Sequence, residues 1–182
     1  MTAEEDKITV DAALFEGMFV RAMRPDPPFA AELKELGFDL GKMQPRYSMR
    51  VWRNSLNAAR RRLFNERSEE KGYRALGNLF VEGYFETIIG KVLAIPFSLV
   101  PVEKVIERMP KTWHTARADL QLDPPVKEGP QRWRVTFHDA FPMPDFIAGV
   151  VEGASRRTRL KQGATVDIER LGPQGFDLVI WW

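Results

Sequence analysis

Residues 133 to 182 constrain the fold most, because they carry a strand, a helix and a strand pair in close succession. Trp133 to Phe137 predicts a strand, and a proline-bounded helix follows from Asp145 to about Arg159. Two more strands, Ala164 to Arg170 and Phe176 to Trp182, are expected to pair across the turn 171–175. This pattern is typical of an α+β domain, and it contains no nucleophile, metal-ligand set or phosphate-binding loop.

The bulk composition predicts one domain, residues 1–182, because 182 residues with 44% hydrophobic and 29% charged side chains suit a globular protein of ordinary size. Residues 1–6 are acidic and lack an apolar run, so we expect a disordered tail. The sequence has no cysteine, which excludes disulfides, zinc–thiolate sites and thiol catalysis. Its most apolar stretch, Val92 to Val102, is far shorter than the ~20 residues of a membrane span. We therefore expect a cytoplasmic protein without membrane contact.

Two helices are expected in the middle of the chain. Pro45 opens the first, and its buried stripe recurs near helical spacing at Tyr47, Trp52, Leu56, Ala59 and Leu63. The second runs from about Glu69 to Ala94 and contains Gly77, Gly83 and Gly90. Each glycine costs up to ~1 kcal/mol relative to alanine in an exposed helix. We therefore expect this helix to lie against another backbone, where a side chain would not fit.

Shorter elements flank these helices. Ile8 to Met23 reads as a strand, or as a strand running into a short helix. Pro101 starts an amphipathic helix that is expected to end at Pro110, which leaves Trp113 and His114 in the following segment. The predicted architecture is a set of helices packed on one face of a twisted antiparallel sheet of four or five strands.

Several segments resemble a known family. Leu14 to Val20, Tyr47 to Phe64 and Leu76 to Phe85 are similar to the opening motif and central helices of an uncharacterised myxobacterial paralogous family, a domain of unknown function. Phe146 to Gly153 and Phe176 to Trp181 resemble its C-terminal half. The C-terminal pattern also resembles haem-nitric-oxide-binding (H-NOX) domains, 4-vinyl-reductase domains and TRAPP trafficking subunits. This resemblance implies helices on one side of the sheet, an apolar pocket between them in some members, and dimers in others.

The resemblance makes His114 a candidate haem ligand, because the proximal histidine of H-NOX domains also follows the central helices and precedes the sheet. Those domains then carry a Tyr-x-Ser-x-Arg motif for the haem propionates, which the segment Trp133 to Asp139 lacks. An ordinary surface or hydrogen-bonded histidine is the alternative. If a pocket is present, its candidate lining residues are Phe80, Tyr84, Trp113, His114 and Phe146. His138 and Asp139 point to opposite sheet faces, so we predict no metal site.

An excess of basic residues marks the first central helix. Between Arg46 and Arg74 the sequence has nine basic and three acidic residues, an excess of six. The candidate partner-binding residues on one helical flank are Arg46, Arg50, Arg53, Arg60 and Arg61. Guanidinium groups suit an acidic protein partner, whereas the alternative is a solvated face paired with nearby glutamates. Nucleic-acid binding is not expected, because the net charge is only +2 and no exposed aromatics are interleaved.

These patterns together predict a non-catalytic protein-binding, scaffolding or signalling module that self-associates as a homodimer. No catalytic constellation supports an enzyme, and no cofactor is required. The alternative is a small-molecule sensor that holds an apolar ligand or haem between the helices and the sheet.

Overall fold

A computed structural model describes residues 4–117 and 119–182 of the chain. Its helices are α1 (Ala12–Phe15), the π-helix η1 (Glu16–Met23), α2 (Pro27–Glu35), α3 (Met49–Phe64), α4 (Glu69–Glu86), α5 (Ile88–Leu99), α6 (Val102–Ala116) and α7 (Pro144–Arg156). Its strands are β1 (Thr9–Asp11), β2 (Arg46–Ser48), β3 (Gln121–Leu122), β4 (Val126–Gly129), β5 (Arg132–His138), β6 (Thr165–Gly172) and β7 (Gly175–Trp181). No helix in the described ranges is both long and apolar enough to span a membrane.

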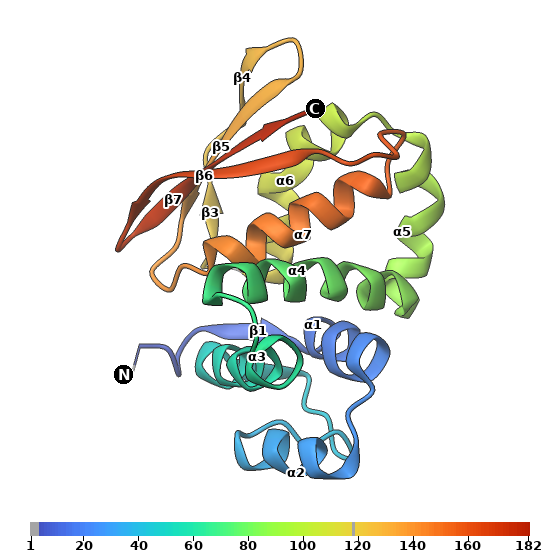
Figure 1. The fold of residues 1–182 in the computed structure, drawn as a ribbon, viewed down its shortest axis with the longest axis vertical. Coiled ribbons are helices and arrows are strands. Elements are labelled where there is room, and N and C mark those ends of the chain that lie inside the picture. The colour runs from blue at the N-terminus through green and yellow to red at the C-terminus, as the bar shows by residue number, and fades with distance from the viewer. Residues whose placement is uncertain (1–3, 118) are drawn as a thin grey trace.

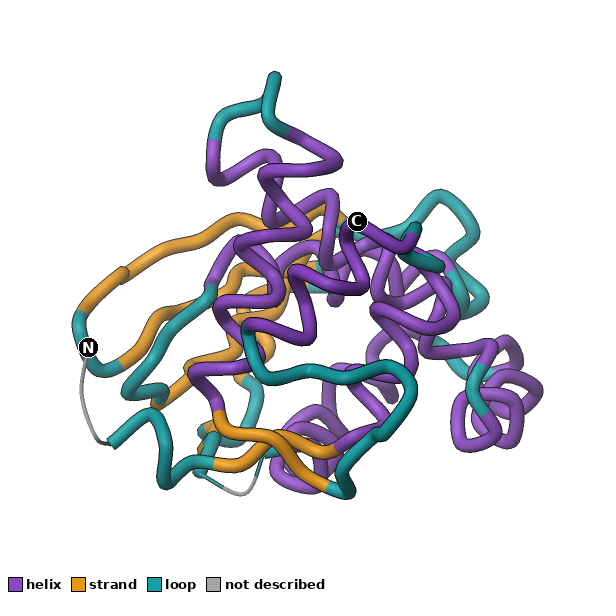
Figure 2. Tube along the Cα trace, turned by 90° about the horizontal axis from the view of Figure 1, so that it is seen from below, coloured by secondary structure: helices purple, strands orange, loops and turns teal. Residues whose placement is uncertain are grey.

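The larger sheet has five antiparallel strands in the order β3-β5-β7-β6, with β4 pairing β5, and β1 pairs β2 in a separate two-stranded sheet. Figure 1 shows α4 and α7 running side by side between the larger sheet and the layer that contains β1, α1 and α3. Seen from below, the strands of the larger sheet gather along one side of the molecule (Figure 2). The predicted combination of helices and a four- or five-stranded antiparallel sheet is confirmed.

The larger sheet has one buried and one wet face, as the alternation in the sequence predicts. Trp133 lies opposite Ile180 in the register and Phe137 lies opposite Phe176, and all four residues are buried. On the other face, Arg134 Nε lies 2.6 Å from a Glu128 carboxylate oxygen. The sheet therefore presents its apolar side to the helices and its charged side to water.

Close approach of backbones explains the helical glycines. A Cβ on Gly77 would lie 2.1 Å from the Phe146 carbonyl oxygen, and one on Gly149 would lie 2.0 Å from the Arg74 carbonyl oxygen. A Cβ on Gly83 would similarly lie 2.1 Å from the Gly17 carbonyl oxygen. The prediction that a glycine-bearing helix lies against another backbone is confirmed for Gly77, which meets α7, and for Gly83, which meets η1. Gly90 lies in α5, where its Cβ would meet the Tyr84 carbonyl oxygen at the end of α4.

Two expectations about the first central helix are wrong. Tyr47 lies in β2, because that segment pairs with β1 and Ser48 caps the helix, with its hydroxyl oxygen accepting from the Val51 amide at 3.4 Å. Tyr47 is still buried. Leu63, expected in the buried stripe, is 45% exposed, and the neighbouring Phe64 packs against the core instead.

Two expected helix boundaries are also wrong. The helix predicted over residues 69–94 is broken at Thr87, whose backbone is extended and whose hydroxyl donates to the Tyr84 carbonyl and accepts from the Gly90 amide. In α6 the helix continues through Pro110 to Ala116. Burial of the apolar row Val102, Ile106 and Met109 stabilises this helix by more than the loss of the one hydrogen bond that Pro110 cannot donate. Trp113 and His114 therefore lie within a helix.

Candidate functional site

The five residues predicted to line an apolar pocket do not come together. Phe80 and Phe146 contact each other with ring centroids 5.8 Å apart, and Tyr84 lies 5.6 Å from Phe80. Trp113 instead packs edge-to-face on Phe137 at 5.7 Å. His114 has an exposed side chain at the end of α6. The structure thus joins three of these residues in the interior and leaves His114 in solvent.

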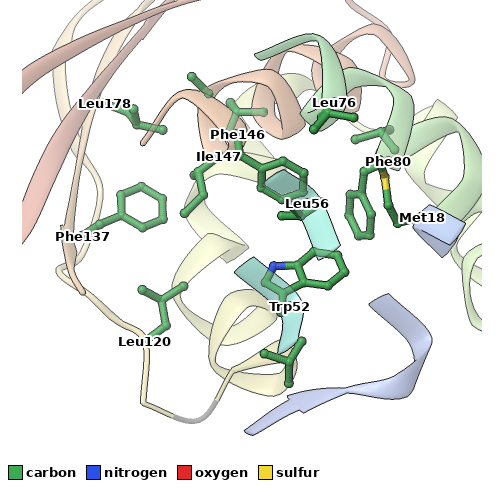
Figure 3. Packing of buried hydrophobic residues seen from close by; sticks show 14 of the residues in the cluster. Met18, Trp52, Leu56, Leu76, Phe80, Leu120, Phe137, Phe146, Ile147 and Leu178 are labelled. Atoms are coloured by element: carbon green, nitrogen blue, oxygen red, sulfur yellow. The ribbon is translucent and has the colours of Figure 1, made fainter. Parts of the chain in front are cut away.

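Side chains fill the interior between α3, α4 and α7. The Trp52 ring lies 6.3 Å from the Phe80 ring and 5.9 Å from the Phe146 ring, so the three form a triangle of aromatic contacts. Figure 3 shows this cluster facing Phe137 and Leu120 across the core. All five residues are buried.

Two hollows lie at one edge of this interior and share Arg53 and Tyr73. The larger, which we call the Arg53 cavity, has a volume of about 340 Å³, and the smaller has about 160 Å³. The Arg53 cavity is lined by Arg53, Glu69, Glu70, Tyr73, Pro142, Met143, Pro144, Asp145 and Phe146. Sequence reasoning placed Arg53 and Phe146 in two different candidate sites, and the structure brings them together.

Three elements position the polar groups of the cavity. Ser68 caps α4 by accepting from the Lys71 amide, which places Glu69 and Glu70 in the first helical turn. Pro144 opens α7 and places Asp145 in its first turn. Carboxylates are favoured at helix N-termini by the helix dipole, so each of these residues suits its position locally. Because the two helix starts converge, their carboxylates line one cavity.

The cavity holds two groups with perturbed acidity. Burial raises the pKa of the Asp145 carboxyl, Arg74 lowers it, and the negative charges of Glu70 and Glu69 raise it further. Burial and the charge of Glu69 also raise the pKa of the Tyr73 phenol, although Arg60 opposes this shift. Within the described residues, Glu69, Glu70 and Asp145 form no salt bridge. The charge of Asp145 is therefore offset by the nearby charge of Arg74 and not by a direct ion pair.

The positive charge of Arg53 is already matched. Its guanidinium pairs with the carboxylate of Glu5, which is buried, and it also lies 5.9 Å from the centre of the Phe141 ring. Asp6 accepts a hydrogen bond from Arg50 at 2.8 Å. These two ion pairs hold Glu5 and Asp6 against α3 in the described structure. The disordered tail over residues 1–6 stays a prediction. Residues 1–3 lie outside the described part of the chain.

The other predicted partner-binding arginines also have contacts within the chain. Arg46 donates to the Thr9 hydroxyl at 3.3 Å, and Arg61 lies 3.6 Å from the Glu32 carboxylate. Arg60 stacks over the Tyr73 ring at 5.7 Å. The five arginines thus contact five other segments of the molecule, and their role toward a partner stays a prediction.

The remaining candidate groups give no metal centre. His138 lies on the wet face of the sheet and contacts the Asp123 carboxylate at 2.9 Å. Among residues 4–117 and 119–182, no three His, Asp or Glu side chains are grouped to hold a metal ion. Sequence reasoning overlooked Tyr73 and Asp145; the Pro142-Met143-Pro144-Asp145 helix start was the one available signal for the latter.

The fold class emerges from comparison with solved structures. An oxygen-binding H-NOX domain related to soluble guanylate cyclases matches with a TM-score of 0.68 and 11% identity, over 93% of this chain and 91% of that chain. An Fe(II) unliganded H-NOX protein from K. algicida matches with a TM-score of 0.65 and 9% identity, over 94% and 95%. A structure solved to study haem redox potential and porphyrin distortion matches with a TM-score of 0.70 and 12% identity, over 94% and 99%. The chain therefore has an H-NOX-like fold. At sequence identities this low, the similarity shows the fold alone.

The family follows from the sequence. Residues 9–182 match the family described as "Protein of unknown function (DUF2378)", and the chain belongs to that family. No curated protein matches the sequence. The predicted resemblance to a family of unknown function and to H-NOX domains is confirmed.

Proposed function

We propose that this chain is a small-molecule-responsive signalling module whose ligand, a small organic cation, binds in the Arg53 cavity. The observation that carries the proposal is the cavity itself: three carboxylates without salt-bridge partners in the described structure, set against the aromatic rings of Tyr73 and Phe146. Carboxylates and aromatic faces both attract an ammonium or guanidinium group. The H-NOX-like fold supports a sensor at the level of architecture.

The position of the cavity suits a signalling role. Arg53 belongs to α3 in the N-terminal layer, whereas Glu70 and Asp145 begin α4 and α7, which lie next to the sheet. A cation held between these groups interacts with both layers at once. Its binding energy would favour the arrangement in which α3 and the two helix starts are closest.

A matched ligand panel tests the proposal. Agmatine and spermidine are expected to raise the thermal unfolding midpoint of the wild-type chain, and glutarate is not, because only the cations neutralise the carboxylates. In Glu70→Gln and Asp145→Asn variants, the dissociation constant measured by calorimetry is expected to rise about tenfold each, which corresponds to ~1.4 kcal/mol. The exposed Glu66→Gln is the control and should bind like wild type. Equal stabilisation by cations and anions, or binding unaffected by both cavity variants, would contradict the proposal.

Self-association through α5 is a second candidate function. Val92 and Leu99 of this helix are 73% and 60% exposed, and their spacing of seven residues places them on one face. Lys91 is the one charged residue in the sequence of α5, so the helix lacks the charge pattern that selects a charged partner. We propose a second copy of the chain as the occupant, because a two-fold axis pairs the same apolar row with itself.

The oligomeric state tests this second candidate. Light scattering after gel filtration is expected to give a dimer for the wild-type chain and a monomer for the Val92→Glu/Leu99→Glu variant. Leu63→Glu, which also replaces an exposed leucine, should stay dimeric. A wild-type chain that is monomeric at every concentration rules out the second candidate and leaves the cavity proposal untouched.

A further inference from the structure

We infer that this chain keeps the H-NOX fold without haem, because neither of its histidines faces an enclosed apolar space. In the H-NOX domains that the chain resembles, a proximal histidine holds the haem iron inside a water-excluding pocket. The sequence has no cysteine and only two histidines, His114 and His138. Both side chains are exposed in the structure. The inference concerns the interior of the molecule and does not depend on the Arg53 cavity.

The orientation of α6 keeps His114 out of the interior. The buried row of this helix, Val102, Ile106 and Met109, continues to Trp113, whose ring meets Phe137. His114 follows Trp113 directly, and one residue step turns a side chain about 100° around a helix. The inward position at this level of α6 is therefore occupied by an indole ring, which cannot ligate iron.

A buried ion pair fixes the end of α6 in this orientation. Arg117 contacts the two carboxylate oxygens of Asp139 at 2.8 and 3.1 Å, and its amide donates to the Trp113 carbonyl at 2.9 Å. Asp139 directly follows β5 and is buried. Rotation of α6 that turned His114 inward would separate this pair and leave a buried charge without its partner.

Aromatic rings pack on both the helical side and the sheet side of the described interior. Trp52, Phe80 and Phe146 contact one another on the helical side, and the rings of Phe137 and Phe176 stack 4.7 Å apart on the sheet side (Figure 3). Protein interiors are close-packed, so a planar ligand can enter only by displacing such rings. Both hollows described above lie at the edge of this core beside Arg53 and Tyr73.

Titration of the full-length chain with haem tests the inference. We expect the absorbance to rise without saturating at one equivalent, no sharp Soret band, and an unfolding temperature unchanged by haem. His114→Ala should behave identically. A saturable one-to-one Soret band with a raised unfolding temperature overturns the inference, whether or not His114→Ala abolishes that band.

Discussion

The aromatic interior and the Arg53 cavity are neighbours that share Phe146, yet they are built in opposite ways. In the interior, Trp52 and Phe80 complete a ring of aromatic contacts. In the cavity, Glu70 and Asp145 face an open space without an ion-pair partner among the described residues. Aromatic rings that are packed on one another stabilise the fold. Carboxylates that lack an ion-pair partner indicate a candidate binding site.

The charged groups of the two regions show the same difference. Asp139 is buried but both of its carboxylate oxygens contact the guanidinium of Arg117, so its charge is fully matched. Asp145 is less buried and has no ion-pair partner in the described structure. Burial is the main cause that raises its pKa; Arg74 lowers the pKa, and Glu70 and Glu69 raise it. Burial with a matched partner therefore keeps a carboxylate charged, whereas burial without an ion-pair partner raises its pKa.

The largest expected effect lies in the interior. Phe80→Ala removes a ring that contacts both Trp52 and Phe146, and truncation of a buried phenylalanine costs about 3–5 kcal/mol of unfolding free energy. Urea unfolding followed by tryptophan fluorescence measures this loss. The matched control, Leu63→Ala, removes a side chain that is 45% exposed and should change stability by no more than ~0.5 kcal/mol. Equal losses in the two variants would mean that the interior is not the stabilising region.

Much of the interior could be predicted from the sequence, because burial there follows local periodicity. The alternation around Trp133 and Val135 gives a strand with one buried face, and the structure has it. The glycines of α4 predict close helix contact, which α7 provides. These signals depend on residues that are close together in the sequence. They can therefore be interpreted without knowing which helices and strands pack together.

The cavity could not be predicted in the same way. Arg53, Tyr73 and Asp145 are distant in the chain, and nothing in their local sequence says that α3, α4 and α7 converge. Helical spacing predicts Arg53 on an exposed face with other arginines, whereas in the structure its ion pair joins it to Glu5, in a segment that composition predicts to be disordered. The same limit explains Pro110, whose local signal for a helix end is overridden by the packing of α6.

An intermediate effect is expected where the two regions are held together. Gly77→Ala would place a Cβ 2.1 Å from the Phe146 carbonyl, so α4 and α7 must separate. Overpacking of this kind costs about 1–3 kcal/mol, and it should also weaken ligand binding in the cavity, because both helix starts line it. Chemical denaturation and calorimetry measure the two effects. Gly41→Ala is the control, since its Cβ would meet only the Asp39 carboxylate at 3.3 Å on the surface. A Gly77→Ala variant that loses stability but keeps its ligand affinity would show that the contact between α4 and α7 does not determine ligand binding in the cavity.

The smallest effect is expected in the cavity, and its size depends on pH. The folded chain holds the Asp145 proton more tightly than the unfolded chain, because burial and the nearby acids raise the pKa of this carboxyl. Such a group contributes stability at low pH, and that contribution is lost as the pH rises through its folded pKa. Asp145→Asn should therefore unfold at a slightly higher temperature than wild type at pH 7 and at the same temperature at pH 3.

Thermal unfolding at a series of pH values measures this difference, with the exposed Glu66→Gln as the control that should leave it unchanged. An Asp145→Asn variant that is less stable than wild type at pH 7 would show that the α7 dipole already compensates the carboxylate. The carboxylate of Asp145 would then be stabilised within the folded chain itself, as the aromatic rings of the interior are. The negative charge of the cavity would no longer favour a cationic ligand. The opposite result, a stabilised variant that has also lost cation binding, would tie the charge of Asp145 directly to ligand recognition.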